Sequence, residues 1–173
     1  MLDASGLYRI RYGDIFRAVG HFLDTSLFRD LTLVETNDGF IVKGGTIRTG
    51  ETGTGLIPQS FLFTDDDLDT LLDQAIERRG AETSAESLLP SISIDGEKVR
   101  YEDVLRSIGL LVDRLGWHEV VLIQTAVGFH LKGLSKDAPV DRQLNAVALQ
   151  GLLEEMRKGR ETLDAPRRRL WPR

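Results

Sequence analysis

The order of hydrophobic and polar residues changes its period along the chain, and each change marks a predicted element. In residues 12–27, apolar side chains recur at helical spacing on one arc and polar side chains occupy the other. Residues 31–36 then turn to a β-rich composition, and residues 40–43 form a second short β-rich run after Gly39. The pattern therefore predicts an amphipathic helix followed by a β-hairpin whose turn needs glycine at its last position.

The same pattern recurs 89 residues later in the chain. Residues 12–44 align with residues 101–133 without a gap, and 11 of the 33 aligned pairs are identical. We interpret this match as an internal repeat. The alignment resumes at residues 71–73 and 152–154 with an offset of 81, so the second copy is predicted to lack eight residues after its second strand, in the place of the glycine-rich stretch around residues 50–55.

Four further elements are predicted: a strand near residues 55–63, a helix near 65–79, a tight hairpin around Asp95-Gly96, and a last helix over about 138–158. Thr64 with Asp67 is a capping arrangement for the first of these helices, and Asp137 is the expected cap of the last. Residues 84–90 have the composition of a linker. Only the first copy is expected to carry a third strand.

These elements predict an α+β fold of two α-β-β-(β)-α units. Short connections make the strands antiparallel, and helices that cover one sheet face complete the two layers. The predicted boundaries are residues 1–83 for the first unit, 84–160 for the second and 161–173 for a basic tail. We expect the two units to join through a pseudo-two-fold axis into one compact domain.

Composition removes several classes of function. The 173 residues include no cysteine, which excludes disulfide scaffolds, cysteine-ligated metals and thiol catalysis. No apolar run is long enough to span a bilayer, and the residues after Met1 do not begin a signal peptide. A cytoplasmic location is therefore expected.

Polar residues repeat on the two equivalent helices. They are Asp14, Arg17 and Asp24 in the first copy and Asp103, Arg106 and Asp113 in the second. A carboxylate beside an arginine can support acid–base or anion-binding chemistry, but the spacing is also that of exposed ion pairs on a solvated helix face, which is the simpler interpretation. Gly20 and Gly109 occupy the same helical position in both copies, which predicts that another backbone packs closely there.

Other chemical candidates are incomplete. The glycine-rich loop from Gly44 to Gly55 lacks the Lys-Ser or Lys-Thr of a phosphate-binding loop. The acidic run at residues 65–69 lacks the remaining ligands of a calcium loop and suits a helix start. Three histidines, at positions 21, 118 and 130, show no metal-ligand spacing. No cofactor or metal is expected.

Two features point to a partner. The predicted last helix carries a wide apolar arc that includes Leu149, Leu153 and Met156, so either the rest of the chain or a second chain must cover it. Residues 157–173 carry a net charge of +5 against −10 for residues 1–156, and the tail contains Arg167, Arg168, Arg169 and Trp171.

Three functions remain open. The first is a non-enzymatic adaptor or regulator, homodimeric and cytoplasmic, which binds a protein through its sheet or last helix. The second is a nucleic-acid-binding protein that uses the arginine-rich tail. The third is an enzyme or small-ligand binder with a site between the copies that involves Arg17, Arg106, Tyr12 and Tyr101.

Overall fold

A computed structural model describes residues 11–81 and 92–163 of the chain. Its elements in order are α1 (Tyr12–Ser26), β1 (Phe28–Thr36), β2 (Gly39–Gly50), β3 (Gly53–Phe63), α2 (Asp65–Ala81), β4 (Ile92–Ile94), β5 (Glu97–Val99), α3 (Tyr101–Leu115), β6 (His118–Thr125), β7 (Gly128–Ser135), β8 (Ala138–Asn145) and α4 (Ala146–Leu163). The predicted linker at residues 84–90 and most of the basic tail lie outside the described residues.

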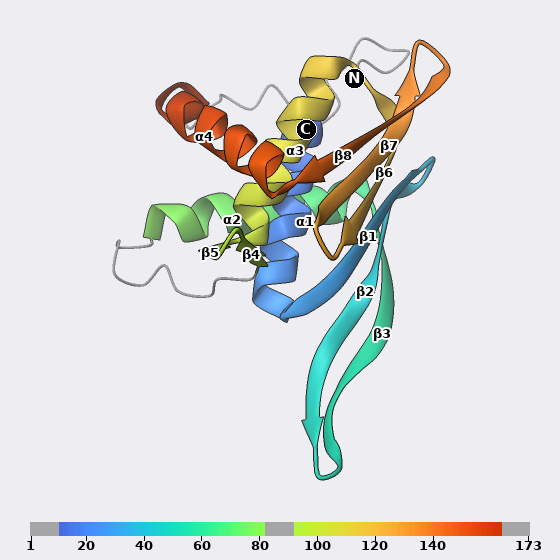
Figure 1. The fold of residues 1–173 in the computed structure, drawn as a ribbon, viewed down its shortest axis with the longest axis vertical. Helices are drawn as coiled ribbons and strands as arrows, with labels where there is room; N and C mark the ends of the chain where they lie inside the picture. The colour runs from blue at the N-terminus through green and yellow to red at the C-terminus, as the bar shows by residue number, and fades with distance from the viewer. Residues whose placement is uncertain (1–10, 82–91, 164–173) are drawn as a thin grey trace.

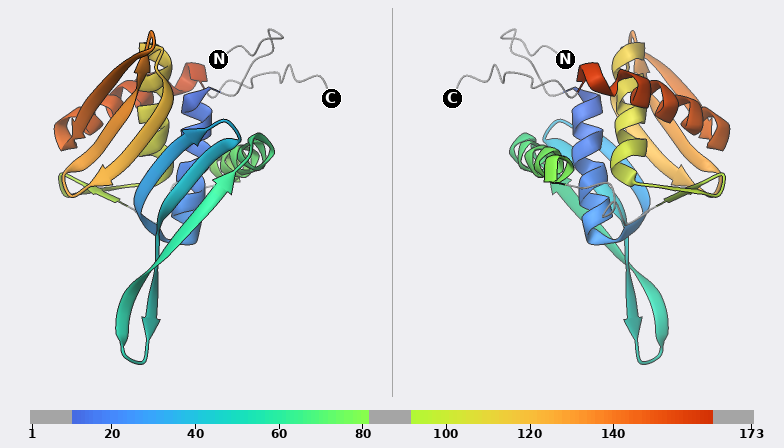
Figure 2. Two further views of the ribbon diagram at one scale, coloured as in Figure 1. Left: turned by 90° about the vertical axis from the view of Figure 1, so that its right-hand side faces the viewer. Right: turned by 90° about the vertical axis from the view of Figure 1, so that its left-hand side faces the viewer.

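Six antiparallel strands form one sheet in the order β3-β2-β1-β6-β7-β8, and the four helices lie on one side of it (Figures 1 and 2). The predicted α+β class is confirmed. The first unit (α1, β1, β2, β3 and α2) and the second unit (α3, β6, β7, β8 and α4) have the same element order and meet at the β1–β6 pair. An origin of this symmetry by duplication stays a prediction.

Gly39 and Gly128 hold equivalent places after the first hairpin turn of each unit. Both have positive φ, 136° and 147°, where other residues are strained. A Cβ atom would also lie 2.1 Å from the carbonyl oxygen of Phe63 at Gly39, and 2.0 Å from that of Leu144 at Gly128. The requirement for glycine in this turn is therefore confirmed, and close approach of the third strand adds a second reason for it.

The prediction for residues 138–145 was wrong, because they form strand β8 and both units carry a third strand. Asp137 does not cap a helix but lies in the β7–β8 turn with a positive φ of 64°. Pro139 fits because β8 is an edge strand, where a missing N–H disturbs no ladder. The helix begins later, where Asn145 Oδ1 accepts a hydrogen bond from the Ala148 N–H at 3.0 Å.

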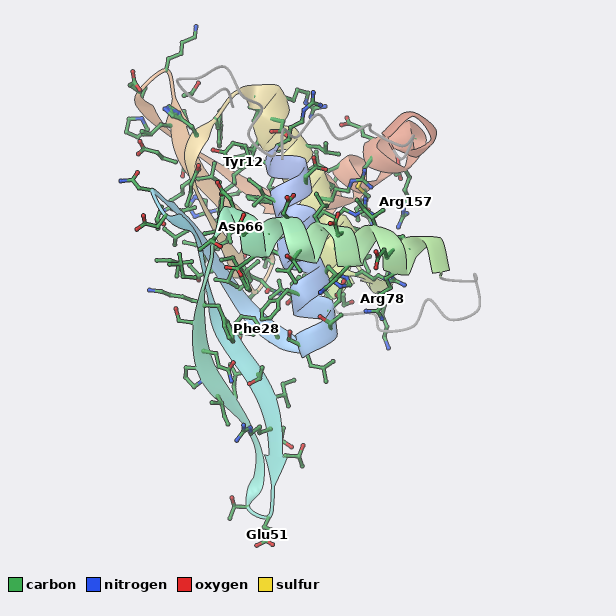
Figure 3. The ribbon with its side chains drawn as sticks, turned by 180° about the vertical axis from the view of Figure 1, so that it is seen from behind. Tyr12, Phe28, Glu51, Asp66, Arg78 and Arg157 are labelled. Atoms are coloured by element: carbon green, nitrogen blue, oxygen red, sulfur yellow. The ribbon has the colours of Figure 1, made fainter. Side chains whose placement is uncertain are left out.

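The eight-residue difference between the units lies in one hairpin. β2 and β3 continue well past the rest of the sheet as a two-stranded ribbon, whereas β7 and β8 end earlier (Figure 1). We call residues 46–57 the arm; Glu51 lies at its tip (Figure 3). The glycine-rich stretch is thus part of a long hairpin, and it does not lead into a helix.

Helices α1 and α3 run antiparallel, side by side across the sheet, with a very short distance between their backbones. A Cβ atom on Gly20 would lie 2.5 Å from the Glu102 Cα, and one on Gly109 would lie 2.3 Å from the Tyr12 carbonyl oxygen. The predicted close packing at both glycines is confirmed. It brings the two units together along the middle of the molecule.

Candidate functional site

Most of the polar residues that repeat on α1 and α3 lie against a neighbouring helix and not in solvent, so the prediction of a solvated helix face was wrong. Arg17, Asp24 and Arg106 are buried, because the close helix packing places each stripe against the other helix. Asp113 accepts hydrogen bonds from the backbone N–H groups of Tyr12 and Gly13 at 3.0 and 2.9 Å. These two donors belong to the first turn of α1, where a carboxylate is the usual cap.

Asp24 does the same for the other helix. It accepts hydrogen bonds from the backbone N–H groups of Tyr101 and Glu102 at 3.0 and 3.1 Å. Neither helix is capped by the residue that precedes it, since the side chains of Arg11 and Arg100 make no capping hydrogen bond. Each unit therefore completes the first helix of the other. Burial raises the pKa of Asp113, and its two backbone hydrogen bonds oppose that rise.

The two tyrosines of the proposed inter-unit site also have structural roles. Tyr12 Oη donates to Glu35 Oε2 at 2.7 Å, and the same oxygen accepts the Val120 N–H at 2.9 Å. In the equivalent place Tyr101 Oη donates to Gln124 Oε1 at 2.8 Å, which accepts the Leu31 N–H at 3.2 Å. These bonds tie the helices to the β1–β6 seam. Burial raises the pKa of Tyr101.

Arg17 and Arg106 do not meet the tyrosines around a cavity. Arg17 Nε donates to Glu102 Oε1 at 2.9 Å in the buried contact between α1 and α3. Arg79 of α2 lies 3.7 Å from the same carboxylate and also pairs with Asp103. None of the four residues of the proposed inter-unit site lines either of the two cavities found in the described part of the chain. A cavity of about 10 Å³ does lie at the junction of the units, but His21, Asp24, Arg78, Arg100 and Glu102 line it.

The apolar arc of the last helix is covered within the chain. Leu149, Leu153 and Met156 are each no more than 2 % exposed, and α4 contacts α3, β8 and β4. Met156 also lines a cavity of about 240 Å³ between α3 and α4, together with Ser107, Leu110, Leu111, Arg114, Leu152 and Glu155. These three side chains belong to the core of the second unit, so they do not present a surface to a partner in this structure.

The capping arrangement predicted at the start of α2 is present, whereas the predicted tail residues lie outside the described part of the chain. Thr64 N donates to Asp67 Oδ2 at 2.9 Å at the start of α2, which confirms the capping arrangement, and this bond lowers the pKa of Asp67. In the described part of the chain, no group of three or more His, Asp or Glu side chains is arranged to hold a metal ion. Arg167, Arg168, Arg169 and Trp171 lie outside the described residues.

The face of the sheet opposite the helices carries a row of apolar side chains. Leu62, Ile41, Val34 and Val121 stand opposite one another in register across β3, β2, β1 and β6. Their neighbours in the same strands, such as Leu33 and Val42, are fully buried toward the helices, so alternation directs the row to the other face. We call these four residues the open-face row.

The arm continues this surface. Ile47 and Leu56 are a cross-strand pair, 48 % and 46 % exposed, and alternation places them on the same side as the open-face row. Lys43 and Lys132 lie on the same side at equivalent positions of β2 and β7, and both are exposed. The open face is therefore apolar in its middle with a lysine in each unit.

Sequence reasoning overlooked this row, although a signal was present. Residues 33–34 and 120–123 are apolar at consecutive positions, where a strand with one solvated face would alternate. Consecutive apolar residues indicate that both faces of β1 and β6 have apolar surroundings. The described helices cover only one of them.

No described helix is both long and apolar enough to cross a membrane. No family model matches the chain, and neither a curated protein nor a solved structure is significantly similar to it.

Proposed function

We propose that this chain is a non-enzymatic protein-binding module whose docking surface is the open face of its sheet, extended by the arm. The observation that carries the proposal is the open-face row, four apolar side chains in register on the face that no described helix covers. Sheets with helices on one side commonly leave polar residues on the other, so an apolar row there favours a partner.

Two findings support the open face over the other surface considered. The apolar arc of α4 is already used inside the chain, because Leu149, Leu153 and Met156 are buried. The inter-unit polar residues are committed to helix caps, ion pairs and the sheet seam. An adaptor or regulator that works in the cytoplasm, with a protein or a second copy of this chain as its partner, is the function that we infer.

The test is capture of partners with matched variants. Leu62→Glu places a charge in the open-face row at a side chain that is 51 % exposed, so the fold should tolerate it. Val147→Glu is the control, since Val147 is an exposed apolar residue of α4, on the helical side. We expect the wild type and the Val147→Glu variant to enrich the same protein, and the Leu62→Glu variant to lose it at least tenfold.

Two results would contradict the proposal. One is equal enrichment by the Leu62→Glu variant and the wild type. The other is recovery of nucleic acid as the only partner, with binding that falls steeply as salt rises, which would favour the lysines and the arginine-rich tail instead.

A further inference from the structure

His21 of α1 is a buried histidine at the place where α1, α2 and the start of α3 meet. Its side chain is 5 % exposed, and within the described part of the chain its ring makes no hydrogen bond. The ring borders the cavity of about 10 Å³ at the junction of the units, close to the space that one water molecule needs. Buried polar groups normally have partners, so an imidazole in this position calls for a reason.

Charged groups surround His21 on every element that packs against it. They are Arg17 and Asp24 from α1, Arg78 from α2, and Arg100 and Glu102 from the start of α3. Arg78, labelled in Figure 3, lies in the second half of α2; it borders this cavity and is also exposed to solvent. Three of these five groups are positive, and each of them repels a positive charge on the ring, whereas Glu102 attracts it.

The two carboxylates near His21 already have other partners. Asp24 accepts the N–H groups of Tyr101 and Glu102, and Glu102 accepts the Arg17 guanidinium at 2.9 Å. A protonated ring would have to compete with those bonds. Burial lowers the pKa of His21, and Arg78, Arg17 and Arg100 lower it further, while Glu102 opposes them.

The second unit shows that the fold does not need a histidine here. Leu110 holds the equivalent position on α3, and it faces the cavity between α3 and α4. Asp24 and Asp113 each cap the first helix of the other unit, and we call this pair of contacts the crossed caps. The crossed caps and the close contact between α1 and α3 involve equivalent residues of both units. A titratable ring at position 21 is therefore a difference between two otherwise equivalent helix junctions.

We propose that His21 is an acid-sensitive switch: α2 stays packed on α1 and α3 while the ring is neutral, and α2 is loosened when the ring takes up a proton. An imidazolium at this position is repelled by Arg78 on α2 and by Arg17 and Arg100. Arg79 of α2 pairs with Glu102 and Asp103, so disturbance of Glu102 also weakens that attachment. Leu68 and Ala75 hold α2 by apolar burial, which pH does not change.

The direction of the pH effect follows from linkage. The pKa of His21 is lowered in the folded chain, so below the ordinary value near 6.5 the unfolded chain binds more protons than the folded one. The contribution of the neutral His21 ring to the free energy of unfolding is fully present above that value. It decreases as the pH falls toward the folded-state pKa of His21. It changes no further from this group once both states are protonated.

The experiment compares His21→Leu, which copies the second unit, with the wild type. Amide hydrogen exchange in α2 and α4 is followed between pH 7.5 and 5, corrected for the intrinsic dependence of exchange on pH. We expect exchange of α2 in the wild type to rise relative to α4, by about tenfold for each unit by which the His21 pKa is lowered. The rise should be absent in the variant.

Two further measurements keep the proposal open to refutation. His21→Gln cannot titrate in this range, and it replaces His21→Leu if that variant does not fold. His130→Gln is the control variant, because His130 lies on the open face of the sheet and bonds Asp141 at 3.0 Å. The ring of His21 is also titrated by NMR in the wild type. The proposal is overturned if the variant and wild type respond equally to acid, or if His21 titrates at or above the ordinary value.

Discussion

The two units share their inner surfaces and differ on their outer ones. At the seam, equivalent residues do the same work: Asp113 and Asp24 cap the opposite helix, and Tyr12 and Tyr101 bond to Glu35 and Gln124 on the sheet. Elsewhere the units differ: the first has the arm and, where α1, α2 and the start of α3 meet, the buried His21, and the second has a short hairpin and Leu110. The shared contacts hold the two units together, and the differences lie in features that those contacts do not require.

The largest effect is expected where the shared seam is tightest. Gly20→Ala and Gly109→Ala each place a Cβ within 2.6 Å of the opposite helix backbone, which cannot yield without separating α1 from α3. Each should lower the free energy of unfolding by about 1–3 kcal/mol or more, measured by urea denaturation. Gly151→Ala in α4 is the control, because nothing lies near its Cβ position, and it should stabilise by up to about 1 kcal/mol.

That comparison also tests the symmetry itself. If Gly20→Ala is costly and Gly109→Ala is neutral, the two contacts are not equivalent, and the seam is held mainly from one unit.

The crossed caps come next. Asp24→Ala and Asp113→Ala each remove the acceptor for two backbone N–H groups of a helix start, and each should cost about 1–2 kcal/mol. Asp→Asn at the same positions retains one acceptor oxygen and should recover part of the loss. Equal stability of the Ala variants and the wild type in thermal unfolding would show that water replaces these caps without cost.

Tyr12→Phe and Tyr101→Phe measure the seam at the sheet. Tyr12 donates to a carboxylate and Tyr101 to an amide, so the first change should cost more, about 1.5 kcal/mol against about 0.5–1 kcal/mol. Glu35→Gln makes the first unit resemble the second and should bring the two tyrosine effects closer. Double-mutant cycles from denaturation curves give the coupling energies directly.

The smallest effect on stability is expected at the arm. Replacing residues 46–57 with residues 135–138 gives the first unit the hairpin of the second, because Gly45–Pro58 and Leu134–Pro139 are equivalent pairs. Apart from Thr46, which stands opposite Phe28 of β1, the arm residues pair only with one another, so the free energy of unfolding should change by no more than about 0.5 kcal/mol. Partner capture should fall; unchanged capture would limit the docking surface to the open-face row.

Periodicity identified the elements whose apolar side chains are confined to one side. The first helix, the hairpin after it and the cap of α2 followed from local patterns, because a short stretch of sequence contains every group involved. β8 did not, since this edge strand exposes most of its residues and Val140 and Leu144 fit a helical spacing as well as a strand. An exposed edge strand has no alternation to show.

The candidate sites depended on contacts that no local pattern contains. The polar stripe of α1 resembles a solvated face until the polar stripe of α3 is placed against it. Asp24 acts on backbone donors 77 residues away, and backbone donors have no sequence signature. The open-face row likewise exists only through the register of four strands, which the sequence of any one strand does not specify.

The crossed caps have a kinetic consequence. The carboxylate and the helix start that it completes are separated by 77 residues in one case and 101 in the other, so each contact requires distant parts of the chain to be brought together first. Closing such long loops carries an entropic cost that must be met before the contact stabilises anything. A chain whose first helices are finished only by each other is expected to fold in a single concerted step, with the pairing of β1 and β6 as part of its slow event.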